Sequence, residues 1–282
     1  MLKDNENKKE FFDDSYDECD IAVFGIPYDG TTSYRPGTRF GPEAIRNEMY
    51  GLETYSPYLD KDLDECKVCD LGDIEMPFGN RELVMQRIAE ETKSMLQDGK
   101  KTLALGGEHL VSYPVIKEYY NKYNDLVVLH FDAHTDLRDE FFGEELSHAT
   151  VIKRVYDILG DDRIYQFGIR SGTKEEFDFG TEHTNLHKFH AKDISTVAEK
   201  VKDNPIYLTI DLDVLDPSIF PGTGTPEAGG ITFSELMSAI QSMDGLNIVG
   251  ADIVELSPHY DASGVSTAVA CKVLREVLLI MA

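Results

Sequence analysis

Short apolar runs alternate along the chain with longer stretches in which apolar residues recur at helical spacing. The runs are rich in Val, Ile, Leu, Phe and Tyr and are mostly continuous, as in strands that are buried on both faces of a parallel sheet. They predict eight strands, at about residues 20–26, 66–70, 102–105, 126–131, 163–169, 184–189, 205–211 and 247–254. The alternation favours an α/β domain with helices on both faces of one central parallel sheet.

The predicted helices have recognisable ends. Pro42 suits the first position of a helix, because its missing N–H would have no partner there. Asn80 and Thr232 are good N-terminal caps, and Glu235 completes a capping box with Thr232. A strongly apolar helix is expected at 266–280. These signals place helices between the strands, as the crossovers of a parallel sheet require.

Length and composition narrow the class of protein. The chain has 282 residues, of which 41% are hydrophobic, as in globular proteins. Its 27 basic and 52 acidic residues argue against nucleic acid as a partner, because phosphate contacts need a basic face. No apolar stretch is long enough to span a membrane, and the N-terminus lacks the apolar run of a signal peptide, so we expect a cytoplasmic protein. We expect residues 1–18 to form an acidic N-terminal segment and residues 19–282 a single domain.

Three segments have an unusual density of side chains that bind metals. Each begins as an apolar run and passes directly into polar residues, at 103–109, 127–136 and 207–213. The carboxyl ends of parallel strands meet at one edge of a sheet, where open α/β sheets bind their ligands. We therefore expect the polar residues of the three segments to lie together. The candidate metal ligands are His109, Asp132, His134, Asp136, Asp211 and Asp213.

The spacing of these candidates favours a shared site for two ions. Alternate residues of an extended chain point the same way, so Asp132, His134 and Asp136 are expected on one side, as are Asp211 and Asp213. Four carboxylates close together repel one another unless cations lie between them. Six ligands exceed what one ion needs. Two divalent ions about 3.5–4 Å apart, bridged by shared carboxylates, would use them all.

The ligand types bear on the identity of the metal. Most of the ligand atoms are carboxylate oxygens, which favours a harder ion such as manganese over zinc. The general affinity order of divalent ions favours zinc, nickel and cobalt over manganese, so these ions stay open.

Other histidines are expected to lie outside the metal site. His130 directly precedes Phe131, and we interpret it as out of phase with Asp132 and facing elsewhere. The histidines at positions 183, 187 and 190 are interpreted as structural.

The three segments resemble the signature motifs of the ureohydrolase family, which includes arginases and agmatinases. The resemblance extends from about Ile21 to the C-terminal helix. It implies an arginase-like three-layer α/β/α sandwich, with a central parallel sheet of about eight strands, and a single catalytic domain. It assigns one manganese ion to His109, Asp132, Asp136 and Asp211, and the other to His134, Asp132, Asp211 and Asp213, with Asp132 and Asp211 bridging the two.

Two further positions match family residues that act on the substrate. Glu255 ends the segment 250–255 and resembles the glutamate that pairs with the substrate guanidinium. His148 resembles a histidine that shuttles protons, although many relatives have glycine where this chain has Ala149. The resemblance therefore implies that both residues bind the substrate and take part in catalysis.

These roles form one reaction. A guanidinium is a poor electrophile because its positive charge is delocalised. Two metal ions would lower the pKa of a bound water towards neutrality and so supply hydroxide. Asp136 would orient the hydroxide, and Glu255 would hold the guanidinium with charge-assisted contacts. His148 would deliver a proton to the leaving amine, so that the products are urea and an amine.

The substrate is expected to be agmatine, which would yield putrescine and urea as in polyamine biosynthesis. Segments 25–42 and 222–227 most resemble those of agmatinases. Arginases place an acidic residue in the loop that begins at 168–170, where the first positions of this chain are uncharged and Glu175 and Glu176 follow later. Guanidinobutyrate and other ω-guanidino acids are the main alternatives, followed by arginine and formimidoylglutamate.

Two other classes of protein stay open. A two-metal phosphoesterase would need arginine or lysine near the metals, whereas Glu255 suits a cationic substrate. A non-catalytic relative could keep the fold, but the six ligands, His148 and Glu255 are all present here. Relatives are commonly trimers or hexamers, so the resemblance implies a homo-oligomer.

Overall fold

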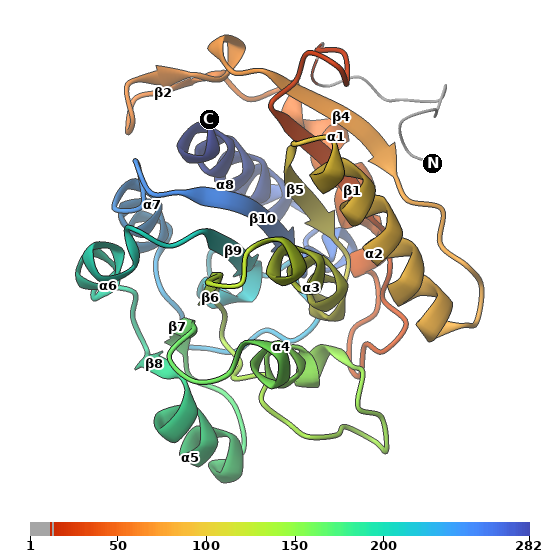
Figure 1. The fold of residues 1–282 in the computed structure, drawn as a ribbon, viewed down its shortest axis with the longest axis vertical. Helices are drawn as coiled ribbons and strands as arrows, with labels where there is room; N and C mark the ends of the chain where they lie inside the picture. Colours follow the sequence, from red (N-terminus) through yellow and green to blue (C-terminus); the bar gives the residue numbers. More distant parts are fainter. Residues whose placement is uncertain (1–11, 13) are drawn as a thin grey trace.

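A sheet of eight parallel strands runs through the middle of the molecule (Figure 1). The computed structural model describes Phe12 and residues 14–282. The strand order is β4-β1-β5-β10-β9-β6-β7-β8. The strands are β1 (Ile21–Ile26), β4 (Val68–Asp73), β5 (Lys101–Gly106), β6 (Val127–Phe131), β7 (Ile164–Ile169), β8 (Asn185–Lys188), β9 (Ile206–Asp211) and β10 (Ile248–Val254). Each of the eight predicted strands is present, and the predicted parallel sheet is confirmed.

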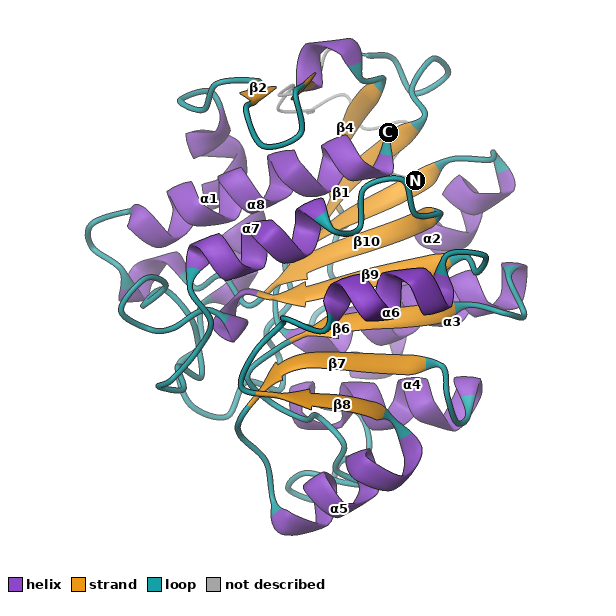
Figure 2. Cartoon of the chain, turned by 90° about the vertical axis from the view of Figure 1, so that its left-hand side faces the viewer, coloured by secondary structure: helices purple, strands orange, loops and turns teal. Residues whose placement is uncertain are grey.

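Helices cover both faces of the sheet (Figure 2). One face packs against α1 (Gly41–Met49), α6 (Ile194–Val201), α7 (Phe233–Gln241) and α8 (Val265–Met281). The other face packs against α2 (Arg81–Gln97), α3 (Ser112–Lys122) and α4 (Val151–Leu159), and α5 (Lys174–His183) lies next to β8. The three-layer α/β/α sandwich is therefore confirmed.

The side-chain alternation of a strand explains why both faces are apolar. In β1, Ile21 and Val23 pack into the core on the α1 and α8 face, whereas Ala22 and Phe24 pack into the core on the α2 and α3 face. A strand that is buried on both faces needs apolar residues at every position. For this reason the strands could be recognised as continuous apolar runs.

Local signals for the helix ends are also borne out. The Asn80 side chain accepts a hydrogen bond from Leu83 N, and the capping box of Thr232 with Glu235 is formed. A short hairpin of β2 (Tyr55–Ser56) and β3 (Lys61–Asp62) was not predicted. Strands of two residues are too short to show an alternating pattern.

The N-terminal segment expected at 1–18 lies partly outside the described residues, which exclude 1–11 and 13. Phe12 is partly buried against the core, and Val68 N donates to the Asp14 carboxylate at 2.8 Å. Across Phe12 and residues 14–282, no helix combines the length and the apolar character needed to cross a membrane.

The strand order places four chain segments around one crevice. Strands β5 and β6 follow each other in the sequence but are separated in the sheet by β10 and β9. The connection after β5 therefore runs across the sheet towards β6, whereas the connection after β9 runs the opposite way, to β10. In open α/β sheets, ligands bind outside the carboxyl ends of strands whose connections diverge in this way. The central strands β5, β10, β9 and β6 end side by side at this edge of the sheet (Figure 2).

Candidate metal centre

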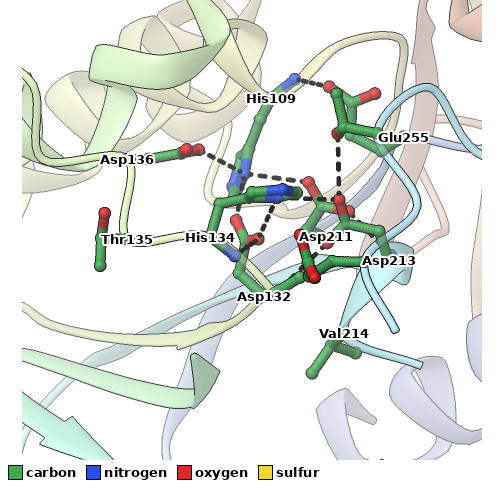
Figure 3. A network of polar contacts seen from close by, with 12 residues as sticks. His109, Asp132, His134, Thr135, Asp136, Asp211, Asp213, Val214 and Glu255 are labelled. Atoms are coloured by element: carbon green, nitrogen blue, oxygen red, sulfur yellow. Dashed lines mark hydrogen bonds and ion pairs between the residues drawn. The ribbon is translucent and has the colours of Figure 1, made fainter. Parts of the chain in front are cut away.

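All six predicted ligands lie at the carboxyl ends of these central strands (Figure 3). His109 begins a short 3-10 helix that follows β5, and Asp132 comes directly after β6. Asp211 is the last residue of β9, and Asp213 lies in the 3-10 turn after it. Five of the six are buried, and the His134 side chain is 24% exposed.

One group of predicted ligands surrounds the Nδ1 atom of His109. Three carboxylate oxygens approach this nitrogen: Oδ2 of Asp132 at 3.0 Å, Oδ2 of Asp136 at 3.3 Å and Oδ2 of Asp211 at 3.3 Å. The Nδ1 atom is buried and has no hydrogen-bond partner. A small cation would fill the space that the four atoms enclose.

A second group surrounds Nδ1 of His134. Oδ2 of Asp213 lies 3.0 Å from this nitrogen and Oδ1 of Asp132 lies 3.3 Å from it. Asp132 therefore directs one carboxylate oxygen to each histidine. Atoms at adjacent corners of an octahedron are about 3.0 Å apart when the ion lies about 2.1 Å from each. The separations in both groups fit ligands of this kind.

Hydrogen bonds behind His109 determine which of its nitrogens faces the carboxylates. Nε2 lies 2.9 Å from Thr209 Oγ1, and this hydroxyl donates its hydrogen to Asp252 Oδ1 at 2.6 Å. Because a hydroxyl has one hydrogen, Thr209 accepts from His109 Nε2–H. In the neutral ring, Nδ1 then presents a lone pair to three carboxylate oxygens, which is unfavourable unless a proton or a metal cation lies between them. The sequence alone did not reveal this role of Thr209 and Asp252.

The charges of the site show the same need for cations. Burial, followed by the charge of Asp132, raises the pKa of Asp136 to about 7. Burial and the neighbouring Asp213 raise the pKa of Asp211 well above its usual value. The pKa of His109 is raised despite burial, because the carboxylates of Asp132, Asp136 and Asp211 favour the imidazolium. Divalent cations would relieve the same repulsion among the carboxylates and would displace these protons on binding.

The backbone turns sharply at two of the site carboxylates. Asp136 has φ of 53° and Glu255 has φ of 66°, in the left-handed region that side chains other than glycine rarely adopt. Lys153 N donates to Asp136 O at 3.0 Å, and Glu255 N donates to Gly107 O at 2.9 Å. Asp132, His134 and Asp136 therefore meet because the chain turns after β6, and Thr135 points away from them (Figure 3). Simple strand alternation is not the cause.

A cavity of about 240 Å³ opens above the two groups. Its walls include Glu255, His148 and Phe141, and its floor includes His109 and His134, the two histidines among the predicted ligands. Oε1 of Glu255 accepts a hydrogen bond from His109 N at 2.8 Å. The structure thus brings the two further predicted residues, Glu255 and His148, to the same cavity as four of the six predicted ligands, which are His109, His134, Asp136 and Asp211.

His148 is held by the loop that follows β1. Its backbone N donates to Thr31 Oγ1 at 3.0 Å, and its Nε2 lies 3.2 Å from Ser33 Oγ. The Phe141 ring meets the imidazole edge-on, with ring centroids 5.5 Å apart. Burial, followed by the charge of His134, lowers the pKa of His148 to about 4, so that the imidazole is neutral at pH 7.

Glu108 is a buried residue of the site that sequence reasoning missed. Its carboxylate accepts hydrogen bonds from Thr31 N at 2.9 Å and from the hydroxyls of Thr31 and Thr32. The same loop contacts His148, so Glu108 orders the wall of the cavity. Gly107 must be glycine, because an added Cβ would lie 1.9 Å from Tyr28 O. The run of two glycines before Glu108 was the available signal for this close approach.

The expectation that His130 faces elsewhere is wrong. Its Nε2 lies 2.8 Å from Oδ2 of Asp132, and the ring is fully buried. Residues two apart in a strand point to the same face, so His130 is in phase with Asp132. His183 and His187 instead contact Asp161 and Asp193, away from the metal ligands.

Fold and site together define a class: an α/β protein with a His- and Asp-lined centre suited to metal ions, at the carboxyl edge of a parallel sheet. Known proteins of this class match the chain closely. The family model described as Arginase family matches residues 19–280. The chain belongs to the arginase family.

Three relatives show how close the match is. An agmatinase from Bacillus anthracis is 50% identical over 269 residues, which cover 94% of this chain and 93% of the relative. A guanidinobutyrase from Pseudomonas aeruginosa is 35% identical, over 94% of this chain and 87% of its own. The crystal structure of a Clostridium difficile protein has a TM-score of 0.93 and 53% identity, and the match covers 94% of this chain and 98% of that one.

Proposed function

We propose that this protein hydrolyses agmatine to putrescine and urea with the help of two divalent metal ions. One observation carries the proposal: two histidine nitrogens lie among four carboxylates at the floor of a cavity whose wall presents one more buried carboxylate, Glu255. The similarity to the agmatinase from Bacillus anthracis supports this choice of substrate.

The proposed ligands of one ion are His109, Asp132, Asp136 and Asp211, and those of the other are His134, Asp132, Asp211 and Asp213. The contacts around the two histidines support most of this set. The place of Asp211 at the second ion rests on the resemblance to the family. We propose manganese because oxygen atoms outnumber nitrogen atoms among the ligands.

The ions, when bound, supply an activated water by lowering its pKa. The Asp136 carboxylate lies at this floor and accepts a hydrogen bond from the attacking water. Glu255 pairs with the substrate guanidinium. A guanidinium keeps its positive charge in the cavity because its pKa exceeds about 12. Burial and the charges of Glu108 and Asp213 raise the pKa of Glu255 well above its usual value, and a cationic substrate relieves this repulsion.

His148 moves the proton. Its low pKa leaves the imidazole neutral, so it can accept the proton that the attacking water releases. It then donates this proton to the leaving nitrogen as the carbon–nitrogen bond breaks. Water is thereby added across the bond, and the products are urea and the diamine putrescine.

The test is a substrate panel. The purified protein, loaded with manganese, is mixed with agmatine, 4-guanidinobutyrate or arginine, and the urea released is measured. We expect agmatine to give the highest kcat/KM. No urea from any of the three substrates would overturn the proposed function.

A second candidate substrate is favoured by one residue. Arg138 lines the cavity, and its Nε donates to Glu176 at 3.2 Å while its guanidinium lies 4.6 Å from the centroid of the Phe141 ring. Among the cavity-lining residues, all within the described part of the chain, it is the one lysine or arginine. A cation in the wall would attract a carboxylate tail, so guanidinobutyrate is the alternative that the panel tests.

Two further proposals concern the whole chain. Residues 19–282 are proposed to be the single catalytic domain, which the family match over 19–280 supports. Self-association as a trimer or hexamer is proposed from the resemblance to the family, and light scattering during size-exclusion chromatography would measure it.

A further inference from the structure

His130 lies directly behind the proposed bridging ligand Asp132. It is the last residue but one of β6 and is fully buried. On one side of its ring, Nε2 lies 2.8 Å from Oδ2 of Asp132. On the other side, Nδ1 lies 3.1 Å from Nε2 of Gln166, a buried residue of the neighbouring strand β7. His130 therefore bridges the Asp132 carboxylate and the Gln166 amide.

The orientation of the Gln166 amide determines where His130 carries its proton. Nε2 of Gln166 also lies 2.9 Å from the backbone carbonyl oxygen of Thr135. A carbonyl oxygen can only accept, so the atom that faces it is the NH2 group of the amide. The same NH2 group donates its second hydrogen to Nδ1 of His130. Because Nδ1 accepts, the proton of the neutral ring is on Nε2, which donates to Asp132.

With this donor, each oxygen of Asp132 has a fixed hydrogen bond. Oδ1 accepts from the backbone N of His134 at 2.5 Å, and Oδ2 accepts from His130. The carboxylate plane cannot rotate without breaking one of the two. In this orientation Oδ2 faces Nδ1 of His109 and Oδ1 faces Nδ1 of His134, as a bridge between two ions requires.

We propose that His130 is a positioning residue of the metal centre: through Gln166 it is kept as a donor, and as a donor it holds Asp132 in the orientation that bridges both ions. This inference rests on the two-ion centre of the proposed function. Outer hydrogen-bond partners of metal ligands fix their orientation and contribute to metal affinity in this way.

Direct ligation by His130 is a competing interpretation. Ligand atoms of His109, His130 and Asp132 do lie within 4.8 Å of one another. However, one nitrogen of His130 carries the proton given to Asp132, and the other accepts from Gln166. Neither has a lone pair directed at the cavity, so His130 acts through Asp132.

The Gln166 amide also holds a second part of the site. The carbonyl that it contacts belongs to Thr135, which directly precedes the proposed ligand Asp136. One buried side chain thus ties the orientation of Asp132 to the turn that presents Asp136. Loss of this amide should therefore disturb the ligands of the His109 group more than those of the His134 group.

The test compares two amide substitutions of His130. A glutamine amide nitrogen reaches about the place of the histidine Nε2, whereas an asparagine amide nitrogen reaches only the place of Nδ1. His130→Gln keeps the donor to Asp132 and His130→Asn removes it. The affinity for Mn²⁺ is measured by competition with a chelator, and bound manganese is counted by elemental analysis.

For His130→Asn we expect affinity for the weaker-bound ion to fall about 10–100-fold, and for His130→Gln a clearly smaller loss. His187→Asn, at a partly exposed histidine away from the ligands, serves as the matched control and should bind manganese like the wild type. Gln166→Met removes the amide but keeps the length of the side chain, and should lower the affinity in the same direction. Thermal unfolding shows which variants are folded. If His130→Asn does not fold, the inference is tested with Gln166→Met.

Several outcomes would overturn this inference. Wild-type affinity in both His130→Asn and Gln166→Met would do so. Equal weakening by asparagine and glutamine, with one ion lost even at saturating manganese, would make His130 a direct ligand instead. If the wild type binds two ions and releases urea while the variants bind as tightly, only this inference fails. If the wild type binds no manganese, the proposed function fails with it.

Discussion

Oδ2 of Asp132 lies 3.0 Å from Nδ1 of His109, although the strands that precede these residues are separated in the sheet by two others. The contact exists because β10 and β9 end at the same edge, and the loops after β5 and β6 reach across those ends. It joins the β5 segment to the β6 segment at the centre of the proposed site. The side chain of Asp132 is therefore the most informative one to change.

Asp132→Asn should weaken metal binding and nearly abolish turnover. The NH2 group of the asparagine amide replaces one of the two carboxylate oxygens that face the histidines, and an amide nitrogen is a poor metal ligand. We expect the affinity for manganese to fall by more than about 100-fold, beyond the range known for outer partners. Elemental analysis and urea release measure the two effects. The control is Asp139→Asn, whose side chain is 86% exposed; an Asp132→Asn protein with two ions and wild-type turnover would refute the assignment.

Glu255→Gln should leave the metal content unchanged but impair the use of agmatine. A glutamine Oε1 can still accept from His109 N, so the local backbone keeps its contact. The negative charge that faces the guanidinium is lost, which costs about 2–5 kcal/mol when a buried charge pair loses one partner. The measurement is kcat/KM for agmatine alongside bound manganese. Loss of manganese would instead make Glu255 a ligand.

Arg138→Ala should shift preference towards a cationic substrate tail. The Arg138 side chain is 35% exposed, so its charge is partly screened by solvent. We expect the ratio of kcat/KM for agmatine to that for 4-guanidinobutyrate to rise about fivefold, which corresponds to a free-energy difference of about 1 kcal/mol. Arg138→Lys keeps the charge and serves as the control. A ratio that does not change in Arg138→Ala would show that the substrate tail does not reach this residue.

Asp216→Asn should lower stability in a way that depends on pH. Hydrogen bonds from the Ser218 hydroxyl and from the backbone of Ser218, Gly229 and Gly230 lower the pKa of Asp216 to about 2. They close the loop that contains Thr225, a residue of the cavity wall. Because the folded pKa lies below the unfolded value of about 3.9, the stabilisation is present above pH 4 and is lost as pH falls towards 2.

The expected difference in unfolding free energy between wild type and Asp216→Asn is about 1 kcal/mol at pH 7, because solvent screens much of the interaction. Urea unfolding at pH 7, 5 and 3 measures it, and the difference should shrink at pH 3. A difference that grows as pH falls would contradict the role given to the ionised carboxylate.

The main elements were readable from the chain because their signals are local. A strand such as β6 is buried on both faces, so it has an apolar residue at almost every position. Helix caps such as Asn80 depend on residues within one turn. The β2–β3 hairpin was missed because its strands of two residues carry no pattern. The order of the strands was also beyond local signals, since β10 enters between β5 and β9 from the far end of the sequence.

The residues of the candidate site also fall into those that local sequence signals reveal and those that they do not. The six ligand candidates stand out because three apolar strands each pass directly into His or Asp residues. Their outer partners do not stand out. Gln166 and Thr209 are ordinary polar residues in the sequence, and they act only because neighbouring strands bring them next to His130 and His109.

Residue types and their short-range spacing were thus enough to indicate eight parallel strands, a helical layer on each face and a ligand-rich edge. Tertiary structure alone decided that Asp132 faces both histidines, that Asp136 reaches the site through a left-handed turn, and that His130 supports Asp132. The physical reason is the separation along the chain over which each interaction acts. Burial and capping act over a few residues of chain, whereas the direction of a buried hydrogen bond depends on partners that only the folded sheet brings together.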